Sequence, residues 1–338
     1  MDSRVDSMNQ TERRAMSGLS LVFAFRMLGM FMVLPVLATY GPELVSTSGL
    51  PMPLLIGIAI GAYGLTQAFL QIPFGMLSDR IGRKPVIIGG LILFALGGLV
   101  AGQADSMLGV LAGRILQGAG AIAAAIMALV ADLTRDQHRT KAMAMIGMSI
   151  GLSFAVAMVV GPLIAGAAGL AGVFYSTSLL ALVGIALVAL VVPSPQQAQH
   201  HRDAGVARGA FLPALRNADL LRLNYGIAVL HALLMACFVA LPLALQEHAG
   251  LPREQHWWVY LAGLLLSFIG MVPLIIYAER RRRMKRVVLG AILLLALTQL
   301  LMWLSMNSLA ALVVAVVLFF TAFNVLEATL PSMLSKIA

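Results

Sequence analysis

The sequence predicts an all-α polytopic membrane protein, and three observations predict it: composition, the length of the apolar runs and the placement of charge. Hydrophobic residues make up 60% of the 338 positions and charged residues only 11%, whereas a soluble domain typically carries roughly 25% charged residues. Apolar runs of about twenty residues recur along the chain, and a bilayer-spanning helix needs about that length. Runs this continuous favour helices over barrel strands, which alternate over about ten residues.

The apolar runs divide into about ten candidate spans: 17–41, 53–77, 86–104, 107–133, 142–168, 171–192, 221–246, 256–278, 287–305 and 308–332. Most of the 23 lysines and arginines lie between these spans on one face of the membrane. Cytoplasmic loops carry an excess of such residues, so we expect both termini to be cytoplasmic. The formal net charge of +9 then follows from topology, and nucleic-acid binding is not expected.

A weak internal repeat divides the chain into two halves. It matches a proline, an acid and two arginines at a constant offset: Pro73, Asp79, Arg80 and Arg83 with Pro273, Glu279, Arg280 and Arg283. The polar stretch 193–219 has the composition of a linker. We therefore predict an N-terminal half of six helices at 1–192, a cytoplasmic linker at 193–219 and an incomplete C-terminal half of four helices at 220–338.

A charged turn, GMLSDRIGRKP, interrupts the apolar sequence at 75–85. It resembles the signature G-x-L-a-D-R-x-G-R-K that follows the second helix of major facilitator superfamily transporters. Two further stretches resemble motifs of that family in the same order: LAGRILQGAG at 111–120 and GMSIGLSFAVAMVVGPLIAG at 147–166. The latter is similar to the antiporter motif, in which Gly161, Pro162 and Gly166 match and Ala165 replaces a glycine. FRMLGMFMVLPVLATYG and KAMAMIG look like the YajR-like, proton-coupled efflux branch.

The resemblance implies a major facilitator fold of twelve helices in two pseudo-repeat halves, of which about ten are seen here. It implies a secondary active transporter: a proton-coupled exporter, or antiporter, of small molecules by alternating access in a bacterial-type inner membrane. Hydrophobic substrates are one option. We expect no cofactor, no metal and no enzymatic activity, and as partners a substrate, protons and anionic inner-leaflet lipid beside Arg280–Arg286. The sequence stops at LPSMLSKIA, before an eleventh helix, so a truncated non-transporting fragment or scaffold is the alternative.

The resemblance also implies a conformational gate, formed by Gly75, Asp79, Arg80, Gly82, Arg83 and Asp132. A glycine at 75 lets neighbouring helices approach closely, and Gly82 can adopt an unusual turn dihedral. The family's partner for Asp79 is the start of the eleventh helix, so Asp79 is expected to lose that partner here. Arg83 is expected to pair with Asp132 and to favour the outward-facing state. The alternative is that these charges only set topology.

Four ionisable residues lie inside predicted spans: Arg26, Arg114, His231 and Glu327. Such residues are costly in a bilayer and mark functional sites by default. They fall on the first, fourth, seventh and tenth spans, which correspond to the cavity-lining helices of the family. Glu327 and His231 can gain and lose a proton near neutral pH, so we expect them to carry the coupled proton. The arginines stay charged and pair with an acid, tune its proton affinity or bind an anionic group.

Further polar residues within the spans are candidates for lining an aqueous cavity: Tyr63, Gln67, Gln71, Gln117, Asn224 and Asn324. Interhelical hydrogen bonding is the alternative for each of them. Structural hydrogen bonding is likewise the alternative for His231, and Glu327 can instead reach the surface towards the basic run. The sequence contains neither an H-E-x-x-H zinc motif nor a G-x-x-x-x-G-K-[ST] phosphate loop.

Overall fold

The computed structural model describes residues 8–46, 49–194 and 216–337. It divides the chain into two compact units, Met1–Ala204 and Gly205–Ala338. The division falls inside the predicted linker, most of which (195–215) lies outside the described residues. We therefore describe each unit by itself.

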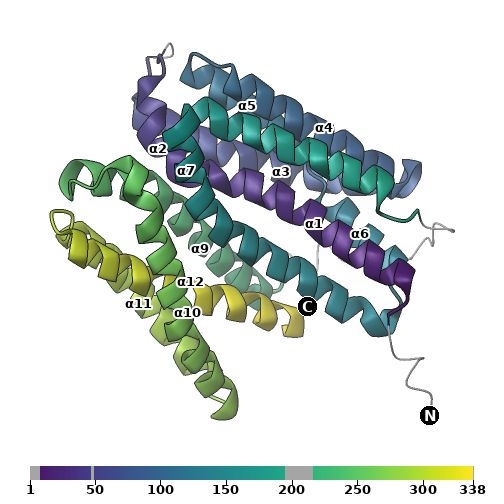
Figure 1. The fold of residues 1–338 in the computed structure, drawn as a ribbon. Coiled ribbons are helices and arrows are strands. Elements are labelled where there is room, and N and C mark those ends of the chain that lie inside the picture. The colour runs from purple at the N-terminus through teal and green to yellow at the C-terminus, as the bar shows by residue number, and fades with distance from the viewer. Residues whose placement is uncertain (1–7, 47–48, 195–215, 338) are drawn as a thin grey trace. The chain divides into compact units, whose positions relative to one another are not determined.

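The N-terminal unit contains these helices: α1 (Gln10–Met32), α2 (Leu34–Tyr40), α3 (Met52–Ile81), α4 (Arg83–Gly102), α5 (Met107–Ala119), α6 (Ala123–Leu133) and α7 (Asp136–Leu190), with a short 3-10 turn at Gly41–Glu43. Helix α7 packs along α1 and α4, and α5 packs against α3 and α4 (Figure 1). Buried apolar side chains from α1, α4, α6 and α7 form its core, among them Leu19, Ile87, Phe94, Ile126 and Ala142.

Two of the predicted spans meet in a single long element. Helix α7 runs from Asp136 to Leu190 but bends at Gly169, where φ is 66° and ψ is −172°. Only glycine adopts such a conformation readily, so the bend marks the boundary between the spans predicted at 142–168 and 171–192. Nine helices in the described part of the chain are long and apolar enough to cross a membrane. Taking the two limbs of α7 separately reconciles that number with the ten predicted spans.

The fourth predicted span, 107–133, is not one continuous helix. Its first part, α5, ends at Ala119 and its second part, α6, begins at Ala123. The chain between them leaves backbone carbonyls outside the helical hydrogen-bond pattern. Irregular backbone at membrane depth is tolerated only where protein groups or water satisfy it, which makes this break a place to look for polar side chains.

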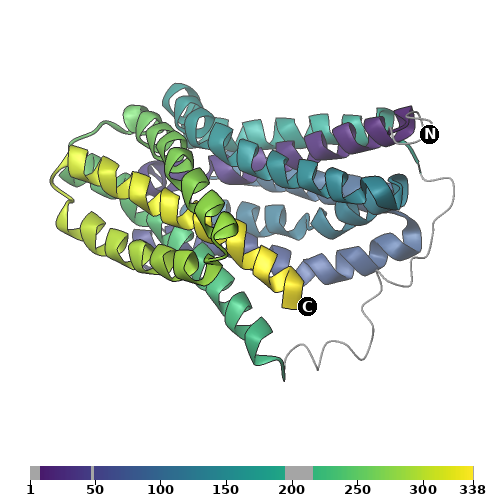
Figure 2. The ribbon, with the colours of Figure 1, turned by 90° about the horizontal axis from the view of Figure 1, so that it is seen from below.

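The C-terminal unit contains α9 (Ala218–Leu243), a π turn (Ala244–His248), a 3-10 turn (Arg253–Gln255), α10 (His256–Arg280), α11 (Met284–Leu304) and α12 (Leu309–Ile337). Helix α12 packs against α9, α10 and α11, and Figure 2 shows α12 in yellow alongside the green helices. Phe319 and Phe320 of α12 are fully buried there. Helix α12 is therefore the central element of this unit.

The predicted repeat has a structural counterpart within each unit. Pro73 lies inside α3 and Pro273 inside α10. Each of these helices ends in a short charged turn that leads into the next helix. Each turn contains a residue with positive φ, Gly82 at 100° and Arg282 at 51°. The arginine is an L-residue in a conformation that such residues rarely adopt, so the second turn carries backbone strain that the glycine avoids.

Candidate functional site

Arg26 lies on α1 and is 1% exposed. Its Nη2 donates hydrogen bonds to Gln67 Oε1 on α3 at 2.9 Å and to the carbonyl oxygen of Gly120 at 3.2 Å. Gly120 belongs to the break between α5 and α6, and its carbonyl oxygen also accepts from the backbone nitrogen of Ile122 at 3.0 Å, so the guanidinium is its second donor. Its Nε and Nη1 are buried without a hydrogen-bond partner among the described residues.

Arg114, the second buried arginine, lies on α5 and is also 1% exposed. Its Nη1 donates to Gln117 Oε1 at 3.1 Å, and its guanidinium carbon lies 4.5 Å from the centre of the Tyr63 ring, which is a cation–π contact. Gln117 in turn donates to Thr177 Oγ1 on α7 at 2.9 Å. Polar side chains from three helices therefore surround this charge, and we call Arg26, Tyr63, Gln67, Arg114 and Gln117 the arginine cluster.

The sequence positions this cluster through helical spacing and one glycine. Tyr63, Gln67 and Gln71 follow one another at intervals of four residues on α3, so they lie on one face of that helix. Gly118 of α5 packs directly against the backbone of α3: a Cβ atom added there would collide with the carbonyl oxygen of Tyr63. That close approach brings Arg114 over the Tyr63 ring.

His231 and Glu327 form a pair in the C-terminal unit. His231 Nε2 on α9 lies 3.6 Å from Glu327 Oε2 on α12, and the two side chains are 46% and 44% exposed. His231 Nδ1 lies 2.9 Å from the carbonyl oxygen of Ile227. A carbonyl can only accept, so Nδ1 carries the proton of the neutral ring and Nε2 turns its lone pair towards Glu327. A proton on Nε2 would create an ion pair with the carboxylate.

The two asparagines predicted to line a cavity lie in different surroundings. Asn324 Nδ2 on α12 donates to Ser267 Oγ on α10 at 2.9 Å, which is the interhelical hydrogen bond of the alternative interpretation. Asn224 is exposed and donates to Leu220, one turn earlier in its own helix, at 2.9 Å.

The charged turn between α3 and α4 is organised by Arg83. Its Nε lies 3.3 Å from Asp132 Oδ2 near the end of α6, and its Nη1 donates to Ser78 Oγ at 2.7 Å. Asp79 forms an ion pair with Arg83, a contact that the sequence analysis did not predict. Both charges lie in the turn that ends α3, and four positions separate them. We call Asp79, Arg83 and Asp132 the Arg83 clasp.

The other residues of the turn differ in backbone conformation, packing and exposure. Gly82 has the positive φ that the sequence predicts for it. A Cβ atom added at Gly75 would lie 3.4 Å from Ala124 Cβ, an ordinary contact, so close helix packing does not by itself require glycine there. Arg80 is exposed. Lys84 donates to the carbonyl oxygen of Val192 at 2.7 Å, beyond the C-terminus of α7, where a cation is favourable.

Residues of the antiporter-like motif lie at the junction of α1 and α2. A Cβ atom added at Gly161 would lie 2.6 Å from the carbonyl oxygen of Met32, the last residue of α1. Pro162 is buried inside α7, whereas Gly166 is exposed. The first two residues therefore let α7 pack closely where the first span changes direction.

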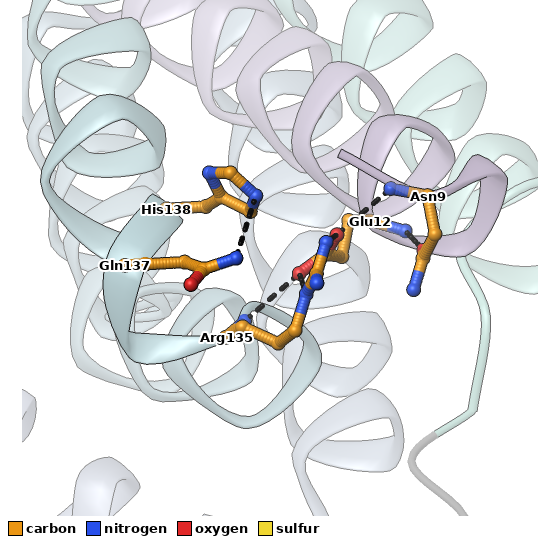
Figure 3. Close-up of polar contacts among 5 residues, drawn as sticks. All are labelled: Asn9, Glu12, Arg135, Gln137 and His138. Carbon is orange, nitrogen blue, oxygen red and sulfur yellow. Dashed lines mark hydrogen bonds and ion pairs between the residues drawn. The ribbon is translucent and has the colours of Figure 1, made fainter. Parts of the chain in front are cut away.

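The sequence analysis missed an ion pair that joins the start of α1 to the connection between α6 and α7 (Figure 3). Glu12, only 3% exposed, accepts hydrogen bonds from Nε, Nη2 and the backbone nitrogen of Arg135, at 2.9, 2.9 and 3.0 Å. Glu12 also completes a capping box with Asn9 at the start of α1. The spacing of Asn9 and Glu12 is the sequence signature of such a box, but it gives no sign of Arg135.

Comparison with known proteins identifies the family to which this chain belongs. The family model described as Major Facilitator Superfamily matches residues 19–338. The chain belongs to the major facilitator superfamily. It is therefore a multi-pass membrane transporter, and this membership accounts for the resemblance of its charged turn and its later motifs to those of the family.

Individual relatives and a solved structure agree with that membership. This major facilitator protein is 54% identical over 329 residues to "Inner membrane transport protein YajR" of Escherichia coli (strain K12), covering 97% of the chain and 71% of that relative. It is 32% identical over 158 residues to "Multidrug resistance protein 2" of Bacillus subtilis (strain 168), covering 46% and 38%. A bacterial homologue of the human lysosomal transporter Spinster, solved inward-facing and occupied, shares the fold with a TM-score of 0.72 at 14% identity, covering 98% and 79%.

Proposed function

We propose that this protein is a proton-coupled exporter that exchanges protons for small molecules, hydrophobic ones among them, by alternating access across the bacterial inner membrane. The observation that carries the proposal is the pairing of His231 with Glu327. The antiporter-like stretch at 147–166 supports export. Inward proton movement supplies about 2.3 kcal/mol per charge per 100 mV and about 1.36 kcal/mol per pH unit.

The geometry of the pair suits reversible protonation. Nδ1–H of His231 donates to the carbonyl oxygen of Ile227. A second proton can therefore bind only at Nε2, on the side of Glu327. A proton on Nε2 would face the carboxylate across 3.6 Å. The Phe323 ring stands edge-on to the imidazole with centroids 6.1 Å apart, one turn before Glu327 on the same helix, and restricts its rotation. The pair therefore holds either one proton or two in a fixed orientation.

Glu327→Gln tests the coupling because it removes the carboxylate and keeps the shape. In inverted membrane vesicles with an acidic interior, we expect proton-driven accumulation of a test panel to fall at least about tenfold. The panel spans three charge classes: benzenesulfonate, benzenesulfonamide and ethidium. Glu254→Gln, an exposed acid in the same unit, is the matched control and should leave accumulation unchanged. Retention of pH-dependent accumulation by Glu327→Gln would exclude it as the proton carrier.

Two further parts of the proposal concern the charged turns. The Arg83 clasp acts as a gate that favours the outward-facing state, and breaking it permits inward opening. The basic run Arg280–Arg286 lies on the cytoplasmic side with both termini and faces anionic lipid of the inner leaflet. Its side chains at Arg281, Arg282 and Lys285 are exposed, which supports a lipid-facing position.

A further inference from the structure

The N-terminal unit contains two buried positive charges that its described acids do not neutralise. Arg26 and Arg114 are each 1% exposed. The described acids of this unit all lie at helix ends or in loops: Glu12, Glu43, Asp79, Asp105, Asp132 and Asp136. Among the described residues, the partners of the two guanidiniums are neutral oxygens and one aromatic ring. Burying an uncompensated charge is costly, and arginine does not escape that cost by losing its proton.

Arg26 is the less satisfied of the two arginines. Only its Nη2 donates hydrogen bonds to described residues, and its Nε and Nη1 are buried without a partner there. Two other polar atoms on the facing side of α3 are also buried without described partners, the Tyr63 hydroxyl and Gln71 Oε1. Arg26 Nε, Arg26 Nη1 and the Tyr63 hydroxyl can donate, whereas Gln71 Oε1 can only accept. The three donors suit a ligand that brings negative charge and acceptor oxygens.

Gln67 is the group that such a ligand would replace. Its amide oxygen is a neutral acceptor for Arg26 Nη2 at 2.9 Å, and its side chain is half-buried. A carboxylate or sulfonate oxygen accepts more strongly from a guanidinium than an amide oxygen does. Gln67 lies one turn from both Tyr63 and Gln71 on the same face of α3. A rotation of the Gln67 side chain would therefore open Arg26 towards that polar face.

We propose that the arginine cluster binds the anionic group of the transported molecule, with an anionic oxygen taking the place of Gln67 Oε1 on Arg26. The substrate class is then a small organic anion, such as a carboxylate or sulfonate. This inference rests on the proposed transport function, because it names the substrate of that function. It adds a charge requirement that the proton-carrying pair in the other unit does not impose.

Ligand-dependent thermal unfolding of the purified full chain tests the inference. The probes are benzenesulfonate and its neutral isostere benzenesulfonamide, at constant ionic strength. We expect benzenesulfonate to raise the apparent Tm saturably, by about 2–4 °C at tenfold its Kd, and benzenesulfonamide to have no effect. Equal shifts with both probes, or no shift with benzenesulfonate, would overturn the proposal.

Substitutions test whether benzenesulfonate raises the apparent Tm by binding at the arginine cluster. Arg26→Gln should abolish the shift by benzenesulfonate. Gln67→Glu should abolish it too, because the new carboxylate pairs with Arg26 internally, while this variant keeps or raises the Tm measured without ligand. The matched control is Gln299→Glu, which adds the same charge at a half-buried glutamine on α11 and should retain the shift. An undiminished shift in both Arg26→Gln and Gln67→Glu would contradict binding at the cluster.

Two outcomes separate this inference from neighbouring ones. If benzenesulfonate fails to bind while proton-driven accumulation of ethidium persists, this inference fails and the transport function stands. If the unaltered chain binds benzenesulfonate but shows no proton-driven accumulation of the test panel, the proposal of proton coupling fails and this inference stands.

Discussion

At the scale of single residues, Arg83 shows how one side chain can join two helix ends. It is 13% exposed and contacts Asp79, Ser78 and Asp132. Of the two acids that pair with Arg83, Asp132 is the more buried, with a side chain that is 7% exposed. Removal of one partner from a partly buried pair leaves an uncompensated charge. The link between the turn after α3 and the end of α6 therefore depends mainly on Asp132.

Asp132→Asn should weaken the gate. We expect the preference for the outward-facing state to fall by about 1–2 kcal/mol. This corresponds to roughly a 5- to 30-fold shift of the conformational equilibrium towards the inward-facing state. Distance distributions between spin labels placed on the two units of the full chain would measure the populations. Asp136→Asn is the control, because its pair with Arg139 is a local contact whose acid is 90% exposed. Identical populations in Asp132→Asn, Asp79→Asn and the unaltered chain would rule out the gate.

The sequence singles out candidate residues more readily than it predicts their partners. Arg26, Arg114, His231 and Glu327 stand out because ionisable residues are rare within apolar spans. The contact between His231 and Glu327 depends on how α9 packs against α12, which composition does not reveal. The same holds for Glu12, whose partner Arg135 lies 123 positions away. The ion pair of Asp79 with Arg83 was not predicted, because only a family partner on another helix was considered and not the neighbour four residues away.

At the scale of elements, glycine sets how closely α7 approaches α1. Gly161→Ala should destabilise the protein by about 1–3 kcal/mol, because its Cβ would lie 2.6 Å from a backbone oxygen that cannot move aside. Gly147→Ala in the same helix meets no atom within 4 Å and should be neutral or stabilising by up to about 1 kcal/mol. Apparent Tm values of the two purified variants provide the comparison. A Gly161→Ala protein as stable as the Gly147→Ala protein would contradict close packing at this site.

Helix breaks were predictable where the chain signals them locally. The boundary near residue 169 was placed correctly because the apolar run is interrupted by glycines there, and Gly169 has the positive φ that only glycine adopts readily. The break after Ala119 was not predicted, although glycines at 118 and 120 stand there as well. Gly120 packs against the carbonyl of Gly90, and this close packing with α4 is not visible in the local sequence.

At the scale of the whole molecule, the basic turns predict orientation. A cysteine introduced as Arg281→Cys should react with a membrane-impermeant maleimide only after cells are permeabilised, because the positive-inside rule places this turn in the cytoplasm. Glu254→Cys, on the opposite face of the predicted topology, should react in intact cells. The native Cys237 is buried and gives little background. The reverse pattern would place both termini outside.

The same labelled position reports on lipid. In reconstituted vesicles, anionic headgroups next to the basic run should slow the labelling of Arg281→Cys relative to zwitterionic lipid, and high salt should remove the difference. Labelling of Glu254→Cys, beside a single arginine, should respond little to lipid charge. Equal labelling rates in both lipids would show that the basic run sets topology only.

The hydrogen bond between Arg26 and the Gly120 carbonyl has a consequence for synthesis in the cell. The two residues are 94 positions apart, and ribosomes add about 5–20 residues per second, so Arg26 leaves the ribosome about 5–20 s before its acceptor does. An arginine at the centre of an inserting helix costs about 2.5–3.5 kcal/mol on the insertion scale. Until Gln67, 41 positions after Arg26, has been added, the apolar residues of α1 alone must keep the first helix in the bilayer. The Arg26–Gly120 hydrogen bond can therefore stabilise the inserted α1 only after the fourth span has been inserted.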